Sequence, residues 1–194
     1  MRYELRDKKQ IFIIHISYLK KEMTKNIYLI GMPSSGKSTL GRQLAKLLNY
    51  TFVDLDSRIE TAESKKISEI FEIKGEDYFR KIENEQLKKI QKDSNLIIAT
   101  GGGTPCFFDG MDFIKKNGIS VFLDVSPTKL VERMKSSNKK VRPLFDMEDK
   151  HLLEALTEKY NSRLKFYQQA DITIQGETDA ETIIWLMEKE FEKK

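Results

Sequence analysis

Short apolar runs alternate with longer amphipathic segments along this chain, and the alternation predicts the elements of the fold. Five runs of four to six residues are rich in β-favouring side chains, as buried parallel strands are; they cover 26–30, 51–54, 96–100, 119–124 and 171–174. Segments with helical spacing of apolar residues separate these runs. The pattern predicts a doubly wound, three-layer α/β/α fold with a central five-stranded parallel sheet.

The first helical segments differ in how their boundaries are marked. Residues 37–48 follow a glycine-rich turn and carry leucines at helical spacing. Charged helices are predicted over 57–74 and 76–92, with Gly75 as the break between them. This helical insertion lies between the second and third strands, and we expect a substrate site there.

The last third of the chain combines a loop with two further helices. Residues 136–150 are rich in charged residues and lack sustained periodicity, which indicates a mobile loop. Helices are predicted over 152–169 and 179–190. We expect Trp185 to be a core or subunit contact. The last helix should close the core with Ile183, Ile184, Leu186 and Met187.

Composition and charge narrow the function classes. The 194 residues are 39% hydrophobic and 33% charged, which is typical of a globular domain. The formal net charge of +4 is small and dispersed, so we expect anionic small molecules rather than nucleic acid as partners. No apolar run approaches the roughly 20 residues that span a bilayer, so no membrane partner is expected.

Cysteine and histidine are too scarce to build a soft-ligand metal centre. Cys106 is the only cysteine, which excludes an intrachain disulfide and favours a reducing, cytoplasmic compartment. His15 and His151 are the only histidines, so a histidine-rich metal site is also excluded. We interpret Cys106 as a packing residue rather than a nucleophile.

The N-terminal segment stands apart from this pattern. Residues 1–22 contain an apolar stretch but no small-residue cleavage site, so a signal sequence is a poor interpretation. We interpret this segment as an upstream extension or a misplaced start, with Met23 as the functional initiator. The alternative is an additional surface helix or strand.

The turn after the first strand carries the clearest chemistry. Residues 31–38 read Gly-Met-Pro-Ser-Ser-Gly-Lys-Ser, the pattern of a P-loop whose backbone N–H groups cradle phosphates at a helix N-terminus. Lys37 is expected to contact the β- and γ-phosphates and Ser38 to ligate Mg²⁺. The alternative is a glycine turn that binds nothing. The predicted nucleotide site comprises Gly31, Met32, Pro33, Ser34, Ser35, Gly36, Lys37, Ser38 and Thr39.

Two aspartates mark the end of the second strand. Asp54 and Asp56 are two residues apart, so both carboxylates can enter one cleft beyond the carboxyl end of the sheet. One could hold Mg²⁺ through water while the other accepts a hydrogen bond from a substrate hydroxyl. The alternative is that Asp56 or Ser57 caps a helix.

An arginine and a glycine triplet complete the candidate residues found from spacing. Arg80 and Glu83 are neighbours on a helix surface, so Glu83 could fix the guanidinium for capture of a carboxylate; taken alone, they are an ordinary surface pair. Gly101, Gly102 and Gly103 follow the third strand, where the backbone can approach a ligand closely. On its own, the triplet could equally be a flexible turn.

Taken together, these residues resemble the shikimate kinases from Met23 to about Glu190. The family is a P-loop kinase family with a lid and a substrate-binding helical insertion. The motifs that agree in order and spacing are the P-loop, Asp54-Leu55-Asp56, Phe79-Arg80 with Glu83, the glycine triplet, Arg142-Pro143-Leu144, and Arg163 with Tyr167. The resemblance implies one domain over 23–194, with substrate-binding helices about 57–92 and a lid about 136–150.

The resemblance also implies the reaction and the role of each residue. The γ-phosphoryl group of ATP would pass to the 3-hydroxyl of shikimate, giving shikimate 3-phosphate and ADP on the way to aromatic amino acids. Asp54 would organise Mg²⁺, and Arg142 would reach the transferring phosphate from the lid. Asp56 would orient the hydroxyl, making Lys37, Asp56 and Arg142 the catalytic set. Shikimate would bind Asp56, Arg80, Gly101, Gly102, Gly103 and Arg163.

Some positions depart from the family pattern. Lys165 stands where the family often has a proline, and Lys135 where an arginine that stacks on adenine is common. Arg133 is a candidate substitute for that arginine. The adenine contacts have no recognisable signature in the sequence. We expect the protein to be a monomer.

Two other functions are weighed against this one. The second hypothesis is another small-molecule kinase, for gluconate or a nucleoside monophosphate, because Pro33 in the loop is a mild resemblance to those enzymes. A GTP-dependent switch is disfavoured, because Val141 stands where a carboxylate would pair with guanine in the segment 138–141.

Overall fold

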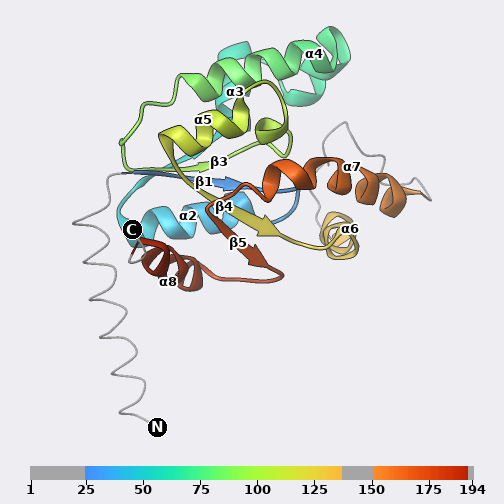
Figure 1. The fold of residues 1–194 in the computed structure, drawn as a ribbon. Coiled ribbons are helices and arrows are strands. Elements are labelled where there is room, and N and C mark those ends of the chain that lie inside the picture. The colour runs from blue at the N-terminus through green and yellow to red at the C-terminus, as the bar shows by residue number, and fades with distance from the viewer. Residues whose placement is uncertain (1–24, 137–150, 192–194) are drawn as a thin grey trace.

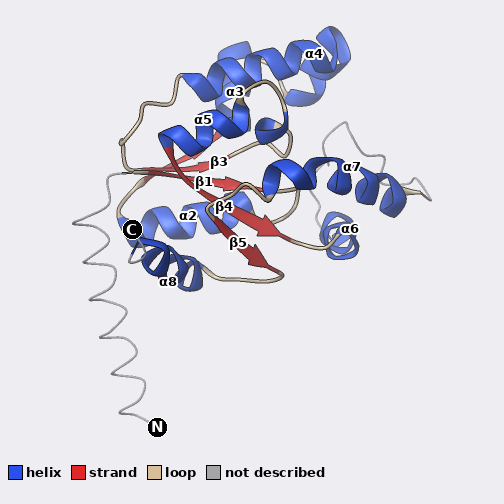
Figure 2. Ribbon diagram, viewed as in Figure 1, coloured by secondary structure: helices blue, strands red, loops and turns tan. Residues whose placement is uncertain are grey.

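The computed structural model describes residues 25–136 and 151–191, and these form a layered α/β unit. All five strands are parallel, in the order β2-β3-β1-β4-β5; Figure 2 labels β3, β1, β4 and β5 of this sheet. The strands are β1 (Asn26–Ile30), β2 (Thr51–Asp54), β3 (Leu96–Ala99), β4 (Gly118–Asp124) and β5 (Ile172–Gln175). The predicted doubly wound fold is confirmed.

The central strand β1 is where the chain changes direction across the sheet. In register, Ile27 lies opposite Ile97 of β3 on one side and Ile119 of β4 on the other. The chain fills β2 and β3 on one side of β1 and β4 and β5 on the other. Ligands of open α/β sheets bind beyond the carboxyl ends of the strands at such a reversal, which places a site after Ile30.

Alternation of side chains along the strands divides the core into two layers. Tyr28 and Ile30 face one layer, while Ile27 and Leu29 face the other. In Figure 1 the helices separate accordingly onto the two faces of the sheet. The first layer includes residues of α3 (Leu55–Glu63), α4 (Ile67–Lys88), α5 (Gly110–Asn117), α6 (Pro127–Ser136) and α7 (Leu152–Tyr167). The second includes residues of α2 (Lys37–Leu48) and α8 (Ala180–Phe191).

The last helix closes the core as predicted, except at Trp185. Ile183, Ile184 and Met187 are fully buried against the sheet, and Leu186 packs at the edge of the same cluster. Trp185 is instead 45% exposed, with the Lys189 ammonium 4.0 Å from its ring centroid. Within the described residues it is therefore no core contact, because its position on α8 faces away from the sheet.

The predicted helix over 57–74 is wrong in its boundaries. Two helices occupy this stretch, because Ser64 adopts a left-handed conformation that ends α3. Lys66 is the N-cap of α4, which begins at Ile67, and the Glu69 carboxylate accepts a hydrogen bond from the Lys66 backbone N–H at 2.6 Å. The predicted break at Gly75 is confirmed: its φ of 78° and ψ of 175° are non-helical, and two helical segments of α4 meet at a kink there.

Two predicted segments lie outside the described residues. The proposed extension 1–22 is one of them. The other is almost all of the predicted loop 136–150, since only Ser136 is described, as the last residue of α6. Within 25–136 and 151–191, no helix combines the length and hydropathy needed to cross a bilayer.

Candidate active site

The P-loop residues form the turn between β1 and α2, at the point where the strand order of the sheet changes direction. Gly36 precedes α2 with φ 101°, and the helix begins at Lys37. The buried Lys37 ammonium donates to the carbonyl oxygens of Gly31 at 2.9 Å and Met32 at 2.7 Å. A cation thus lies beside the N-terminus of a helix, where the backbone dipole also favours anions.

The two predicted magnesium ligands lie next to each other. The Ser38 hydroxyl donates to Asp54 Oδ2 at 2.8 Å. The other carboxylate oxygen of Asp54 accepts the backbone N–H groups of Asp56 at 3.1 Å and Ser57 at 3.4 Å. Asp54 is therefore the cap of α3, and the alternative that Asp56 or Ser57 caps this helix is wrong.

This oxygen pair fits Mg²⁺ and no softer metal. Mg²⁺ in nucleotide sites takes one or two protein oxygens and completes its shell with phosphates and water. Ser38 and Asp54 supply that number, and no group of three or more His, Cys, Asp or Glu side chains with metal-site geometry occurs in the described ranges. The donor set therefore suits a metal that arrives with a nucleotide.

The glycine triplet after β3 brings the remaining predicted residues together. A methyl group on Gly102 would stand 3.1 Å from Arg163 Nη1 and 2.8 Å from Pro33 Cδ. On Gly101 it would stand 3.4 Å from Asp56 Oδ1, and on Gly103 it would overlap the Arg80 guanidinium. Any other residue here would push these groups apart, so the triplet is a point of close packing and not a flexible turn.

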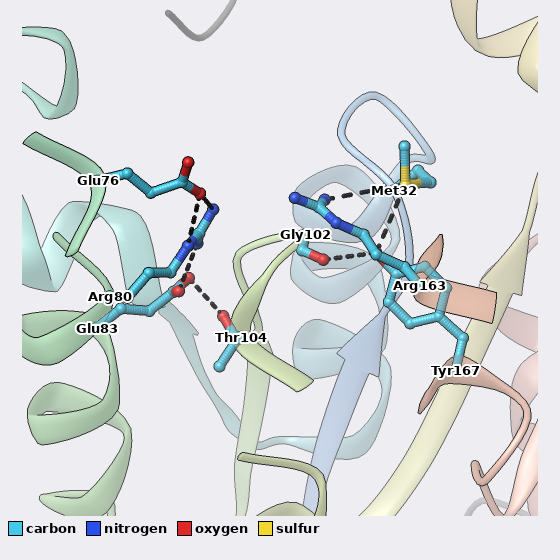
Figure 3. A network of polar contacts seen from close by, with 8 residues as sticks. All are labelled: Met32, Glu76, Arg80, Glu83, Gly102, Thr104, Arg163 and Tyr167. Atoms are coloured by element: carbon cyan, nitrogen blue, oxygen red, sulfur yellow. Dashed lines mark hydrogen bonds and ion pairs between the residues drawn. The ribbon is translucent and has the colours of Figure 1, made fainter. Parts of the chain in front are cut away.

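Arg80 is held on every side. Only 3% of the residue is exposed, and its Nη1 donates to Glu83 at 2.7 Å. Its Nε and Nη2 donate to a single oxygen of Glu76, at 3.1 Å and 2.8 Å. The ring of Phe107 lies 4.4 Å from the guanidinium carbon, and Glu83 is itself fixed by the Thr104 hydroxyl at 2.7 Å. Figure 3 shows the polar contacts among Glu76, Arg80, Glu83 and Thr104.

Arg163 is equally buried but has much weaker partners. It is 3% exposed, and its Nη1 lies 3.9 Å from the Met32 sulfur. Its Nη2 is buried and has no hydrogen-bond partner among the described residues. In Figure 3 the guanidinium of Arg163 points toward the side on which Arg80 and Glu76 lie. A buried cation with an unused donor is suited to an anionic ligand, because leaving that donor unpaired is costly.

Tyr167 fixes the base of this region. Its hydroxyl donates to the Gly102 carbonyl oxygen and lies 3.6 Å from the Met32 sulfur. Its ring stacks on Phe122 with the centroids 4.9 Å apart. Met32 is predicted to bind the nucleotide. Its side chain lies against Arg163 and Tyr167, on the side of the loop where the phosphoryl acceptor is expected.

A hollow lies beside the P-loop, next to Ser34, Ser35 and Gly36. It has a volume of about 470 Å³, and its lining includes Thr39, Gln43 and Arg133. Arg133 Nη1 donates to the Ser35 carbonyl oxygen at 3.2 Å, and its Nη2 lies 3.4 Å from Glu177. The geometry places Arg133, rather than Lys135, against the phosphate loop.

The structure supports the sequence expectation for Cys106, and it does not describe Arg142. Burial raises the pKa of the Cys106 thiol to about 11, which favours the packing role over a nucleophilic one. Arg142, predicted to act from the lid, lies outside the described residues.

Glu76, Thr104 and Phe107 are site residues that sequence reasoning missed. Glu76 stands four residues before Arg80, and the rule that such helical neighbours pair could have found it. Thr104 and Phe107 follow the glycine triplet and carried no comparable signal.

Comparison with known proteins agrees with this geometry. The family profile described as shikimate kinase matches residues 33–191. A curated shikimate kinase of Clostridium botulinum strain 657 is 43% identical over 163 residues, which cover 84% of this chain and 94% of the relative. The crystal structure of shikimate kinase from Bacteroides thetaiotaomicron has a TM-score of 0.78 and 33% identity, covering 87% of this chain and 98% of its own.

A second solved structure was determined with a ligand. It is the shikimate kinase from Acinetobacter baumannii in complex with shikimate, with a TM-score of 0.79 and 30% identity. The match covers 92% of this chain and 97% of that one. The profile match over most of the chain and the identity to these relatives lead to one conclusion: the chain belongs to the shikimate kinase family.

Proposed function

We infer that this protein transfers the γ-phosphoryl group of ATP to the 3-hydroxyl of shikimate, releasing shikimate 3-phosphate and ADP. The observation that carries this function is the position of two buried arginines, Arg80 and Arg163, against neighbouring glycines beside the P-loop. Shikimate has one carboxylate and a ring of hydroxyl groups. Its carboxylate suits the arginines, and its hydroxyls suit the nearby Asp56.

The acceptor side of the site orients the substrate. Arg80 and Arg163 hold the carboxylate from two directions, which fixes how the ring is turned. Asp56, near Gly101 and at the start of α3, accepts a hydrogen bond from the reacting hydroxyl and aims it at the phosphate. Phosphoryl transfer passes through a loose transition state, so this orientation matters more than removal of the proton.

The donor side binds the phosphates and stabilises developing charge. Backbone N–H groups of residues 31–38 and the Lys37 ammonium hold the β- and γ-phosphates of ATP. Ser38 and Asp54 would hold Mg²⁺, which neutralises phosphate charge when bound. Arg142 would add positive charge from the lid and exclude water, which limits hydrolysis of ATP. Its role rests on the family resemblance alone.

The wider assignment follows from the same family. We propose a single catalytic domain over 23–194, a monomeric enzyme and a cytoplasmic location, as is typical of enzymes that draw on cellular ATP. Its product, shikimate 3-phosphate, would then be used in the synthesis of aromatic amino acids.

An acceptor-panel assay tests this function. ADP release is measured with shikimate, gluconate and nucleoside monophosphates, each with ATP and Mg²⁺. We expect turnover with shikimate only, loss of turnover in EDTA and recovery on adding Mg²⁺. Turnover of gluconate but not shikimate would contradict the proposal. Tighter binding of GTP than of ATP would favour the switch interpretation instead.

A further inference from the structure

We propose that Glu76 is a built-in competitor for the substrate's carboxylate, which neutralises Arg80 until shikimate displaces it. The inference rests on the proposed function, because it assumes that Arg80 receives the carboxylate of shikimate. It adds a residue that sets the affinity and anion selectivity of the site. The competition depends on which partner of Arg80 is able to move.

Arg80 itself has no room to move away from its place. Its guanidinium is in contact with the backbone at Gly103 and lies under the ring of Phe107. The ion pair with Glu83 is buried on both sides, with side chains 3% and 2% exposed. A carboxylate that reaches Arg80 must therefore approach along the Nε–Nη2 edge, since Glu83 already occupies Nη1.

Glu76 occupies that edge, and it is the displaceable partner. Its side chain is 39% exposed, so its carboxylate can be taken up by water when it leaves. Both donors of Arg80 converge on one oxygen, Glu76 Oε1. A free carboxylate can instead offer one oxygen to each N–H group, which is the stronger, two-point geometry. Shikimate can thus make a better pair with Arg80 than Glu76 does.

The backbone next to Glu76 is also suited to movement. Gly75 immediately precedes it, with a φ of 78° inside α4, and the space beside its Cα is open within 4 Å. Only glycine adopts this conformation without strain, and a break in the helical hydrogen-bond pattern lowers the cost of re-orienting the next residue. The kink lets Glu76 swing outward while Arg80 stays in place.

The two arginines consequently offer different things to an incoming anion. Arg163 presents a buried donor that has no partner among the described residues, whereas Arg80 is already neutralised by two carboxylates. A carboxylate anchored on Arg163 then exchanges with Glu76 at Arg80. A small anion that brings only charge must also displace Glu76, but it gains no ring or hydroxyl contacts. Glu76 therefore selects against inorganic anions.

The test uses Glu76→Ala and Glu76→Gln in the full chain. For Glu76→Ala we expect the KM for shikimate to fall about twofold to fivefold, which is the contribution of one partly exposed ion pair, with the change in KM and not in kcat. Inorganic sulfate should inhibit this variant more strongly than the wild type, in competition with shikimate. Glu76→Gln should lie between the two, because a neutral amide is a weaker partner for Arg80.

Asp77→Ala is the matched control, because Asp77 is the adjacent exposed carboxylate and is not a partner of Arg80. An equal fall in KM for this variant would reduce the effect to general charge and overturn the proposal. A rise in KM for Glu76→Ala would also overturn it, since Glu76 would then only position Arg80. Calorimetric titration with sulfate reports on the same edge without catalysis. It separates the two failures: absent shikimate turnover contradicts the proposed function, while unchanged sulfate affinity contradicts the role of Glu76.

Discussion

The two halves of the site are built in different ways. In the donor half, the phosphate-binding loop is one contiguous segment, in which the Lys37 ammonium is held by carbonyl oxygens of its own loop. The acceptor half gathers Asp56, Arg80, the glycine triplet and Arg163 from elements far apart in the chain. The phosphate site is thus a product of local backbone geometry, whereas the acceptor site depends on how several elements pack.

This difference also separates what each half contributes. A defect in the loop should affect every acceptor alike, because all of them need the same phosphoryl donor. A defect in the acceptor half should change the affinity for shikimate, or the stability of the fold, and leave ATP binding nearly intact. The following changes are designed to test this division.

The largest effect is expected from the loop. Lys37→Ala should lower kcat with shikimate about 1000-fold, because a charge that stabilises the transferring phosphoryl group is lost. Coupled ADP release measures it. Lys46→Ala, which changes an exposed lysine on the same helix, is the control and should keep normal turnover. A change confined to the KM for shikimate, with kcat unchanged, would contradict the division.

The next effect is on stability in the acceptor half. Arg80→Ala leaves Glu83 buried without its cation, and removing one partner of a buried pair costs about 3 kcal/mol or more. Thermal unfolding should show a melting temperature lower by about 10 °C. The exposed neighbour Lys81→Ala is the control. An unchanged melting temperature would mean that this pair adds nothing to the packing of the site.

Arg163 should affect binding more than stability. Arg163→Ala should raise the KM for shikimate about 30-fold, because a charge-assisted hydrogen bond to the substrate is lost. ATP affinity, measured by titration, should change less than about twofold, because Arg163 lies on the acceptor side of the site. Lys165→Ala, exposed on the same helix, provides the control. An equal loss of ATP affinity would refute the separation of the halves.

The smallest effect concerns the packing of α7, which carries Arg163. The Tyr160 hydroxyl donates to Asp124 of β4 at 2.7 Å, and Tyr160→Phe should cost about 1 kcal/mol in the free energy of unfolding. Burial, with the nearby Asp124, raises the pKa of Tyr160 from 10.0 to about 12. Its contribution is therefore complete below pH 10 and lost as the pH rises toward 12. Denaturant unfolding at pH 8 and pH 11 should show a smaller pH dependence for the variant.

Element boundaries illustrate how far local patterns reach. The strands β1 and β2 and the helix α2 have the predicted bounds, β3 and β4 differ by one residue at one end, and β5 is shifted by one residue at both ends. The prediction over 57–74 failed because Ser64 ends α3 in a left-handed conformation. Serine rarely adopts this conformation, and the sequence has no glycine there to indicate a helix end. The helices α5 and α6 were not delimited from the sequence, since they are short.

The sequence by itself determined the fold class, the phosphate loop and the residue types that an acceptor site requires. Those features are local: periodicity and loop chemistry are set within a few residues of each other. Only the tertiary structure decided the strand order, the contact of Arg80 and Arg163 with the glycine triplet, and the capping role of Asp54. It also decided that Glu76 occupies the Nε–Nη2 edge of Arg80. Such contacts depend on how packed elements orient their side chains, and spacing along the chain does not encode that.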